Sequence, residues 1–142
     1  MITSFSSFRA DLNIVFLPDA DYDANYPQLF TNINLARMGC GGRSALTLEP
    51  VPAATQDKFL TLYAIPGSIP GLVGFNNVVI EFVRLVQAAL VIFGLFPNEA
   101  ALRDGLLCDL TLKGMQRWVH EIGEPYFRLE VCVSFNNPFL EA

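Results

Sequence analysis

The hydrophobic residues of this chain are concentrated in one long run over residues 78–96. Polar or charged side chains interrupt that run only at Glu81, Arg84 and Gln87. Since these three recur at every third position, they follow one narrow edge of a helix. The pattern therefore predicts a buried helix with a narrow polar edge. The uninterrupted apolar part is too short to cross a hydrocarbon layer of about 30 Å, so no membrane span is predicted.

A second helix is predicted from Thr111 to Ile122, after a loop that opens with Asp104-Gly105. Asp-Gly is a strong turn pair because glycine adopts a positive φ without steric cost. Asp109 or Thr111 could cap the second helix by accepting hydrogen bonds from its free N–H groups. We expect the two helices to pack through matching apolar stripes. These stripes are Leu112, Met115, Val119 and Ile122 on the second helix, and Phe82, Leu85, Ala89 and Phe93 on the first.

Shorter elements are predicted before this helix pair. The apolar run Leu12–Leu17 favours a strand, and residues 2–8 predict a weaker one. Apolar spacing predicts a helix over Gln28–Met38, which Gly39 would end. Another helix is predicted to begin at a Thr55 cap.

The expected fold is therefore α+β and mainly helical, with short N-terminal strands followed by a helix-loop-helix core. We expect an N-terminal α/β segment over residues 1–66, a helical unit over residues 76–123 and a C-terminal tail over residues 124–142. Residues 66–74 are rich in proline and glycine and indicate a connector. Loose alternation over residues 127–135 is compatible with one more strand.

Composition adds a further expectation about the surface. The 142 residues form about one domain, with 52% hydrophobic and only 16% charged residues, against about 25% charged in a typical soluble domain. We therefore expect more chain or a partner to cover part of the apolar surface. The net charge of −5 argues against a nucleic-acid-binding protein, which usually needs a basic stripe. The three cysteines form no CxxC pair and no signal peptide is visible, which favours a reducing, intracellular compartment.

Two candidate reaction centres are each better explained as structural features. The only histidine, His120, has Glu121 and Glu124 near it, but adjacent helix residues point about 100° apart. We interpret His120 as a surface residue. The glycine-rich turn Gly39–Ser44 could cradle an anion through backbone N–H groups, but it lacks a Walker-type ending and is interpreted as a structural turn. Within that turn, Cys40 would need a base to act as a nucleophile, and none is near in sequence.

The acidic cluster Asp19, Asp21 and Asp23 alternates like a calcium-binding loop. It lacks the glycine and the final glutamate that such loops require, so a solvated loop is expected. Taken together, the residues predict no catalytic, cofactor-binding or metal-binding site. The chain is expected to be a non-enzymatic protein without a cofactor, and its binding residues are unknown.

Over residues 1–136 the chain resembles the fungal Sin-three-binding proteins, the STB-six and STB-two family. The matching blocks are residues 39–43 with 46–48, 54–59 with 62–63, 79–85 and 104–111. This resemblance implies a non-enzymatic protein-interaction module of a histone-deacetylase corepressor assembly. It also implies a protein partner and a nuclear location.

The helix pair also looks like the repeat of peptidoglycan-binding-like domains. Residues 86–90, the pair Asp104-Gly105 and Thr111 keep that pattern, while Cys108 stands where glycine is usual. The resemblance implies an alternative function, a module that binds a glycan or peptide in a groove between helices. Exposed aromatic side chains would line this groove, and the candidates are Trp118, Tyr126 and Phe127.

Overall fold

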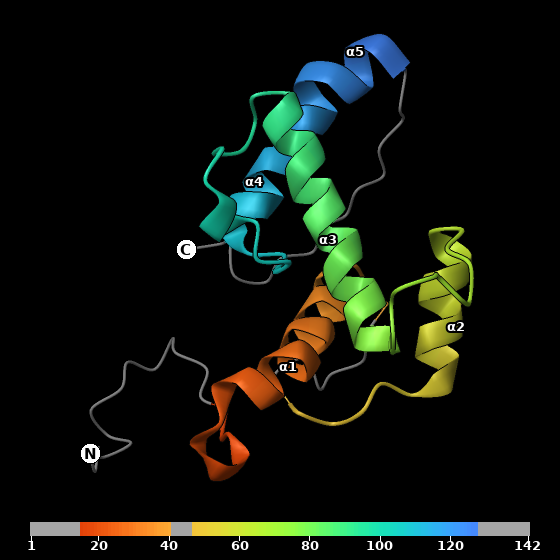
Figure 1. The fold of residues 1–142 in the computed structure, drawn as a ribbon. Coiled ribbons are helices and arrows are strands. Elements are labelled where there is room, and N and C mark those ends of the chain that lie inside the picture. Colours follow the sequence, from red (N-terminus) through yellow and green to blue (C-terminus); the bar gives the residue numbers. More distant parts are fainter. Residues whose placement is uncertain (1–14, 41–46, 128–142) are drawn as a thin grey trace.

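The structure is a computed structural model that describes residues 15–40 and 47–127. Within these ranges the regular elements are all helical and no strand is present. In chain order they are the 3-10 turn η2 Pro18–Ala20, α1 Tyr22–Arg37, α2 Ala53–Leu62, α3 Phe75–Ile92, the 3-10 turn η3 Ala100–Leu102, α4 Asp109–Trp118, the π-helical segment η4 Val119–Gly123 and α5 Glu124–Phe127 (Figure 1). The mainly helical prediction holds, and the predicted α+β class is wrong.

The predicted N-terminal strand Leu12–Leu17 is not found in its described part. Residues 15–17 have no regular structure and run into the turn η2. A short apolar run forms a strand only beside a second strand that pairs with its backbone, and the described chain offers no such neighbour. The weaker strand over residues 2–8 lies outside the described residues. So does the strand suggested over residues 127–135, apart from Phe127, which ends α5.

Helix α1 starts where the sequence predicted an acidic loop. Asp21 is its N-cap, and its Oδ1 accepts a hydrogen bond from the N–H of Ala24 at 3.0 Å. Pro27, which precedes the predicted helix start at Gln28, lies inside the helix. The predicted end is confirmed, because Gly39 adopts a φ of +72° and the Cys40 N–H returns to the Leu35 carbonyl in a glycine C-cap.

Helix α2 begins two residues before its predicted cap. Its N-cap is Pro52, so Thr55 lies in the first turn and the predicted Thr55 cap is wrong. Phe59 is fully buried, and its ring packs edge-to-face against both Phe75 and Phe82 of α3. These ring contacts fix α2 beside the first half of α3.

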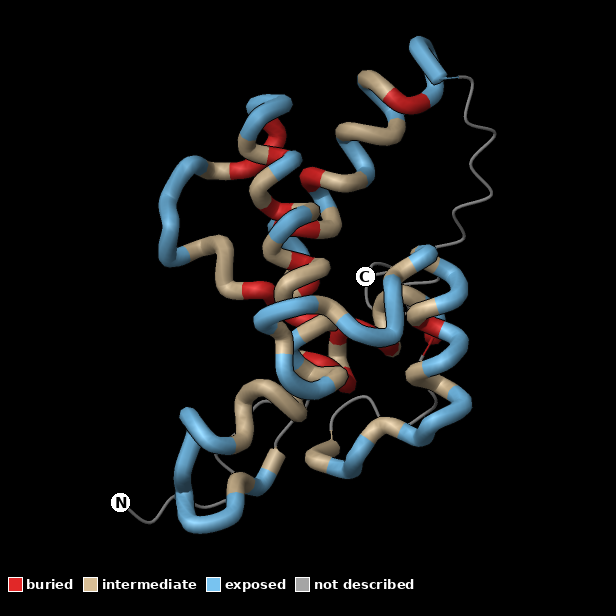
Figure 2. Tube along the Cα trace, turned by 45° about the vertical axis from the view of Figure 1, so that its right-hand side comes forward, coloured by how far each residue is buried: buried red, intermediate tan, exposed pale blue. Residues whose placement is uncertain are grey.

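Helix α3 is shared by two hydrophobic cores. Its first half contributes Val79 to a core with Leu35 of α1 and Phe59 of α2. Its second half contributes Leu90 to a core with Leu95 and with residues of the α4 region. Buried positions follow α3 from one core to the other (Figure 2). Each buried large side chain is worth about 1.5–3 kcal/mol, so α3 is the main packing element.

The face that α3 turns toward α4 differs from the predicted one. Val86 and Leu90 lie in the core that contains Met115, whereas Leu85 is 69% exposed and Phe93 is 50% exposed. Of the predicted stripe of Phe82, Leu85, Ala89 and Phe93, only Phe93 meets α4, through its ring contact with Trp118, and the other three do not form this interface. Since α3 is apolar on nearly all sides, periodicity alone could not select the buried side.

Among the described residues, α3 is also the helix that is long and apolar enough to cross a membrane. Its 18 residues have a mean hydropathy of 1.6, and 28% of them are buried inside the protein. A core helix of a soluble protein has the same length and composition. Here α3 packs against α1, α2 and α4, with a buried glutamine at its centre.

Candidate functional site

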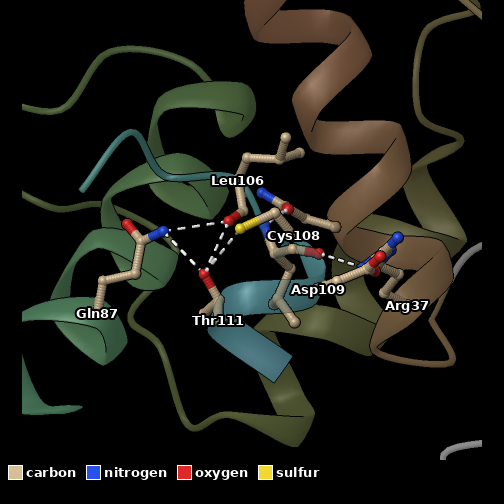
Figure 3. A network of polar contacts seen from close by, with 8 residues as sticks. Arg37, Gln87, Leu106, Cys108, Asp109 and Thr111 are labelled. Carbon is tan, nitrogen blue, oxygen red and sulfur yellow. Dashed lines mark hydrogen bonds and ion pairs between the residues drawn. The ribbon is translucent and has the colours of Figure 1, made fainter. Parts of the chain in front are cut away.

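The loop between α3 and α4 is held by a network of polar contacts that joins three helices (Figure 3). The loop turns at Asp104-Gly105, as predicted. Gly105 has a φ of +83°, and Asp104 Oδ1 accepts a hydrogen bond from the Leu106 N–H at 2.9 Å. This turn presents the loop backbone to side chains from α1 and α3.

Gln87 of α3 is the centre of the network and is fully buried. Its Oε1 accepts a hydrogen bond from the Gly105 N–H at 3.0 Å. Its Nε2 donates to the Leu106 carbonyl and to Thr111 Oγ1, both at 3.1 Å. The sequence placed Gln87 on a polar outer edge, and the structure turns it inward. The one signal for this was the glutamine of the peptidoglycan-binding-like pattern.

Asn34 of α1 binds the same loop from the other side. Its Nδ2 donates to the Gly105 carbonyl at 2.8 Å, and its Oδ1 accepts from the Leu107 N–H at 2.7 Å. One turn further on, Arg37 donates to the Leu107 carbonyl and pairs with Asp109 Oδ1, both at 2.8 Å. Sequence reasoning missed Asn34 and Arg37, because their partners lie about 70 positions away in the chain.

The network also changes the roles predicted for Asp109 and Thr111. The N-cap of α4 is Cys108, without a side-chain cap bond. Asp109 pairs with Arg37, and Thr111 Oγ1 donates to the Leu106 carbonyl at 3.3 Å while Cys108 Sγ lies 3.4 Å from it. In the described chain every buried side-chain nitrogen and oxygen has a hydrogen-bond partner. The polar groups of the network therefore satisfy one another, and the network joins the three helices as a structural feature.

His120 is a surface residue, as predicted. Its side chain is 84% exposed on the π-helical segment, and Nδ1 lies 3.1 Å from Glu124 Oε2. Glu121 turns to Arg117 instead, with 2.9 Å between its Oε1 and the Arg117 Nε. The described residues contain no group of three His, Cys, Asp or Glu side chains that could hold a metal ion.

Cys40 belongs to the first hydrophobic core. Burial raises the pKa of its thiol, and the nearby positive charge of Lys58 opposes that shift in part. A thiol in this environment is less nucleophilic than a free one. Residues 41–44 of the predicted glycine-rich turn lie outside the described residues. The acidic cluster was expected to be a solvated loop, and this is wrong: Asp19 lies in η2, Asp21 caps α1 and Asp23 lies in the first turn of that helix.

The buried position of Cys40 leads to a testable expectation. In a variant with Cys108→Ser and Cys132→Ser, alkylation of Cys40 by iodoacetamide at pH 8 should be at least about tenfold slower in the folded chain than in urea. Because burial raises the pKa of the Cys40 thiol, its alkylation rate should keep rising at pH values above those at which the rate of a free thiol levels off. Mass spectrometry of timed samples measures both effects. Equal rates in the folded and unfolded chain would contradict this placement.

Three aromatic side chains form a line beside the end of α3. Trp118 packs against Phe93 with ring centroids 6.0 Å apart, and stacks on Phe127 at 6.2 Å. In an α-helix, residues nine apart are about two and a half turns apart and point in opposite directions. The wider π-helical turn between Trp118 and Phe127 changes this angle, so that the two rings meet.

The predicted groove aromatics do not line the hollow that the structure shows. That hollow, of about 430 Å³, lies where the first half of α1, the residues before α2 and the start of α3 meet. Its lining includes Pro27, Val51 and Phe75, whereas Trp118 and Phe127 pack on each other and Tyr126 is 78% exposed.

The fold and the network define a small helical scaffold with exposed apolar side chains on α3 and α5. The chain is homologous to two proteins of Saccharomyces cerevisiae (strain ATCC 204508 / S288c). It is 31% identical to Protein STB6 over 153 residues, which covers 91% of this chain and 20% of that protein. It is 27% identical to Protein STB2 over 157 residues, which covers 91% of this chain and 18% of that protein. The chain thus spans about a fifth of the length of each relative.

No family model matches the chain, and no solved structure matches it. The similarity to the two yeast proteins supports the resemblance to the STB-six and STB-two family. The comparisons do not show a peptidoglycan-binding-like unit. Four residues of that pattern, Gln87, Asp104, Gly105 and Thr111, nevertheless meet in the network.

Proposed function

We propose that this chain is a non-enzymatic protein-interaction module of a Sin-three-type histone-deacetylase corepressor assembly in the fungal nucleus. The observation that carries the proposal is the similarity to Protein STB6 and Protein STB2 over 91% of the chain. The resemblance of this chain to the Sin-three-binding protein family supplies the partner class. The module binds protein and performs no chemistry of its own.

The geometry supports a scaffold role in two ways. The buried network fixes the α3–α4 loop with contacts from three helices, which gives the module a rigid shape. Large apolar side chains remain exposed around this rigid centre, among them Leu85, Ile92 and Phe127. Exposed apolar surface on a firmly held framework is typical of a protein-binding site.

A replacement experiment in yeast tests the proposed function. The segment of Protein STB6 that matches this chain is deleted, and in a second strain it is replaced by residues 1–142. We expect the deletion to reduce recovery of the Sin-three scaffold in immunoprecipitates severalfold, and the replacement to restore it. The measured quantity is scaffold recovered per unit of tagged STB6.

A matched control uses the replacement chain with Gln116→Ala, an exposed change on α4 that should leave recovery unchanged. Unaltered scaffold recovery after deletion of the matching segment, with the truncated STB6 present at normal abundance, would contradict the proposal.

A further inference from the structure

We draw no further inference here: the strongest candidate, the exposed apolar surface patch of Leu85 and Ile92 on α3 and Phe127 on α5, carries no proposal, because nothing in the structure shows what covers it.

Discussion

Replacing Gly105 by alanine is expected to destabilise the fold by about 2–5 kcal/mol. A Cβ at this position would lie 2.6 Å from Ile80 Cγ2 and 2.9 Å from the Ile80 carbonyl oxygen. The second contact involves helix backbone, which cannot rotate away as a side chain can. The φ of +83° adds the steric cost of a left-handed conformation for a residue with a Cβ. Urea-induced unfolding followed by circular dichroism measures the loss.

Gly71→Ala is the matched control for this prediction. Gly71 has a nearly identical φ of +85°, but a Cβ there would meet no atom within 4 Å. The control variant therefore isolates the conformational cost, about 1–2 kcal/mol. The difference between the two variants reports the close approach of the loop to α3. If Gly71→Ala were as destabilising as Gly105→Ala, the packing against Ile80 would have no measurable role.

Replacing Gln87 by leucine is expected to cost about 2–4 kcal/mol of unfolding free energy. Leucine has a similar size but cannot hydrogen-bond, so the buried Gly105 N–H loses its acceptor, while the Leu106 carbonyl loses one donor and keeps the Cys108 N–H and the Thr111 hydroxyl. A buried donor or acceptor without a partner costs roughly 1–3 kcal/mol. Thr111 also loses the amide that donates to its hydroxyl. The same urea titration gives the free energy.

Gln116→Leu provides the control for Gln87→Leu. Gln116 is an exposed residue of α4, so the same chemical change there should alter stability by less than about 0.5 kcal/mol. A Gln87→Leu chain as stable as wild type would show that the network does not hold the loop. In that case Asn34 of α1 would be the side chain that positions Gly105 and Leu107 without help from Gln87.

Local sequence signals predicted the positions of most helices. Gly39 ended α1 as expected, and Asp104-Gly105 formed the expected turn, because each depends on the conformational freedom of glycine. The start of α1 was misplaced. Asp21 could serve either a loop or a helix cap, and the residues after it decided in favour of the helix.

The candidate site could be predicted only in part. The surface position of His120 was visible in the sequence, whereas its contact with Glu124, four residues further on, was found only in the structure. The network was not visible, since Asn34 and Gln87 approach Gly105 from helices far apart in the chain. Nothing local distinguishes a buried, fully bonded glutamine from one on a solvated edge.

The sequence by itself determined that the chain is mainly helical, that it carries more apolar surface than its charged residues can balance, and where the α3–α4 loop turns. These properties depend on residues that are neighbours in the chain. Only the tertiary structure decided which side of α3 is buried, because that helix is apolar on nearly all sides and can be packed in several ways. The polar contacts of Gln87 and Asn34 fix one arrangement, and with it they leave Leu85 and Ile92 facing solvent.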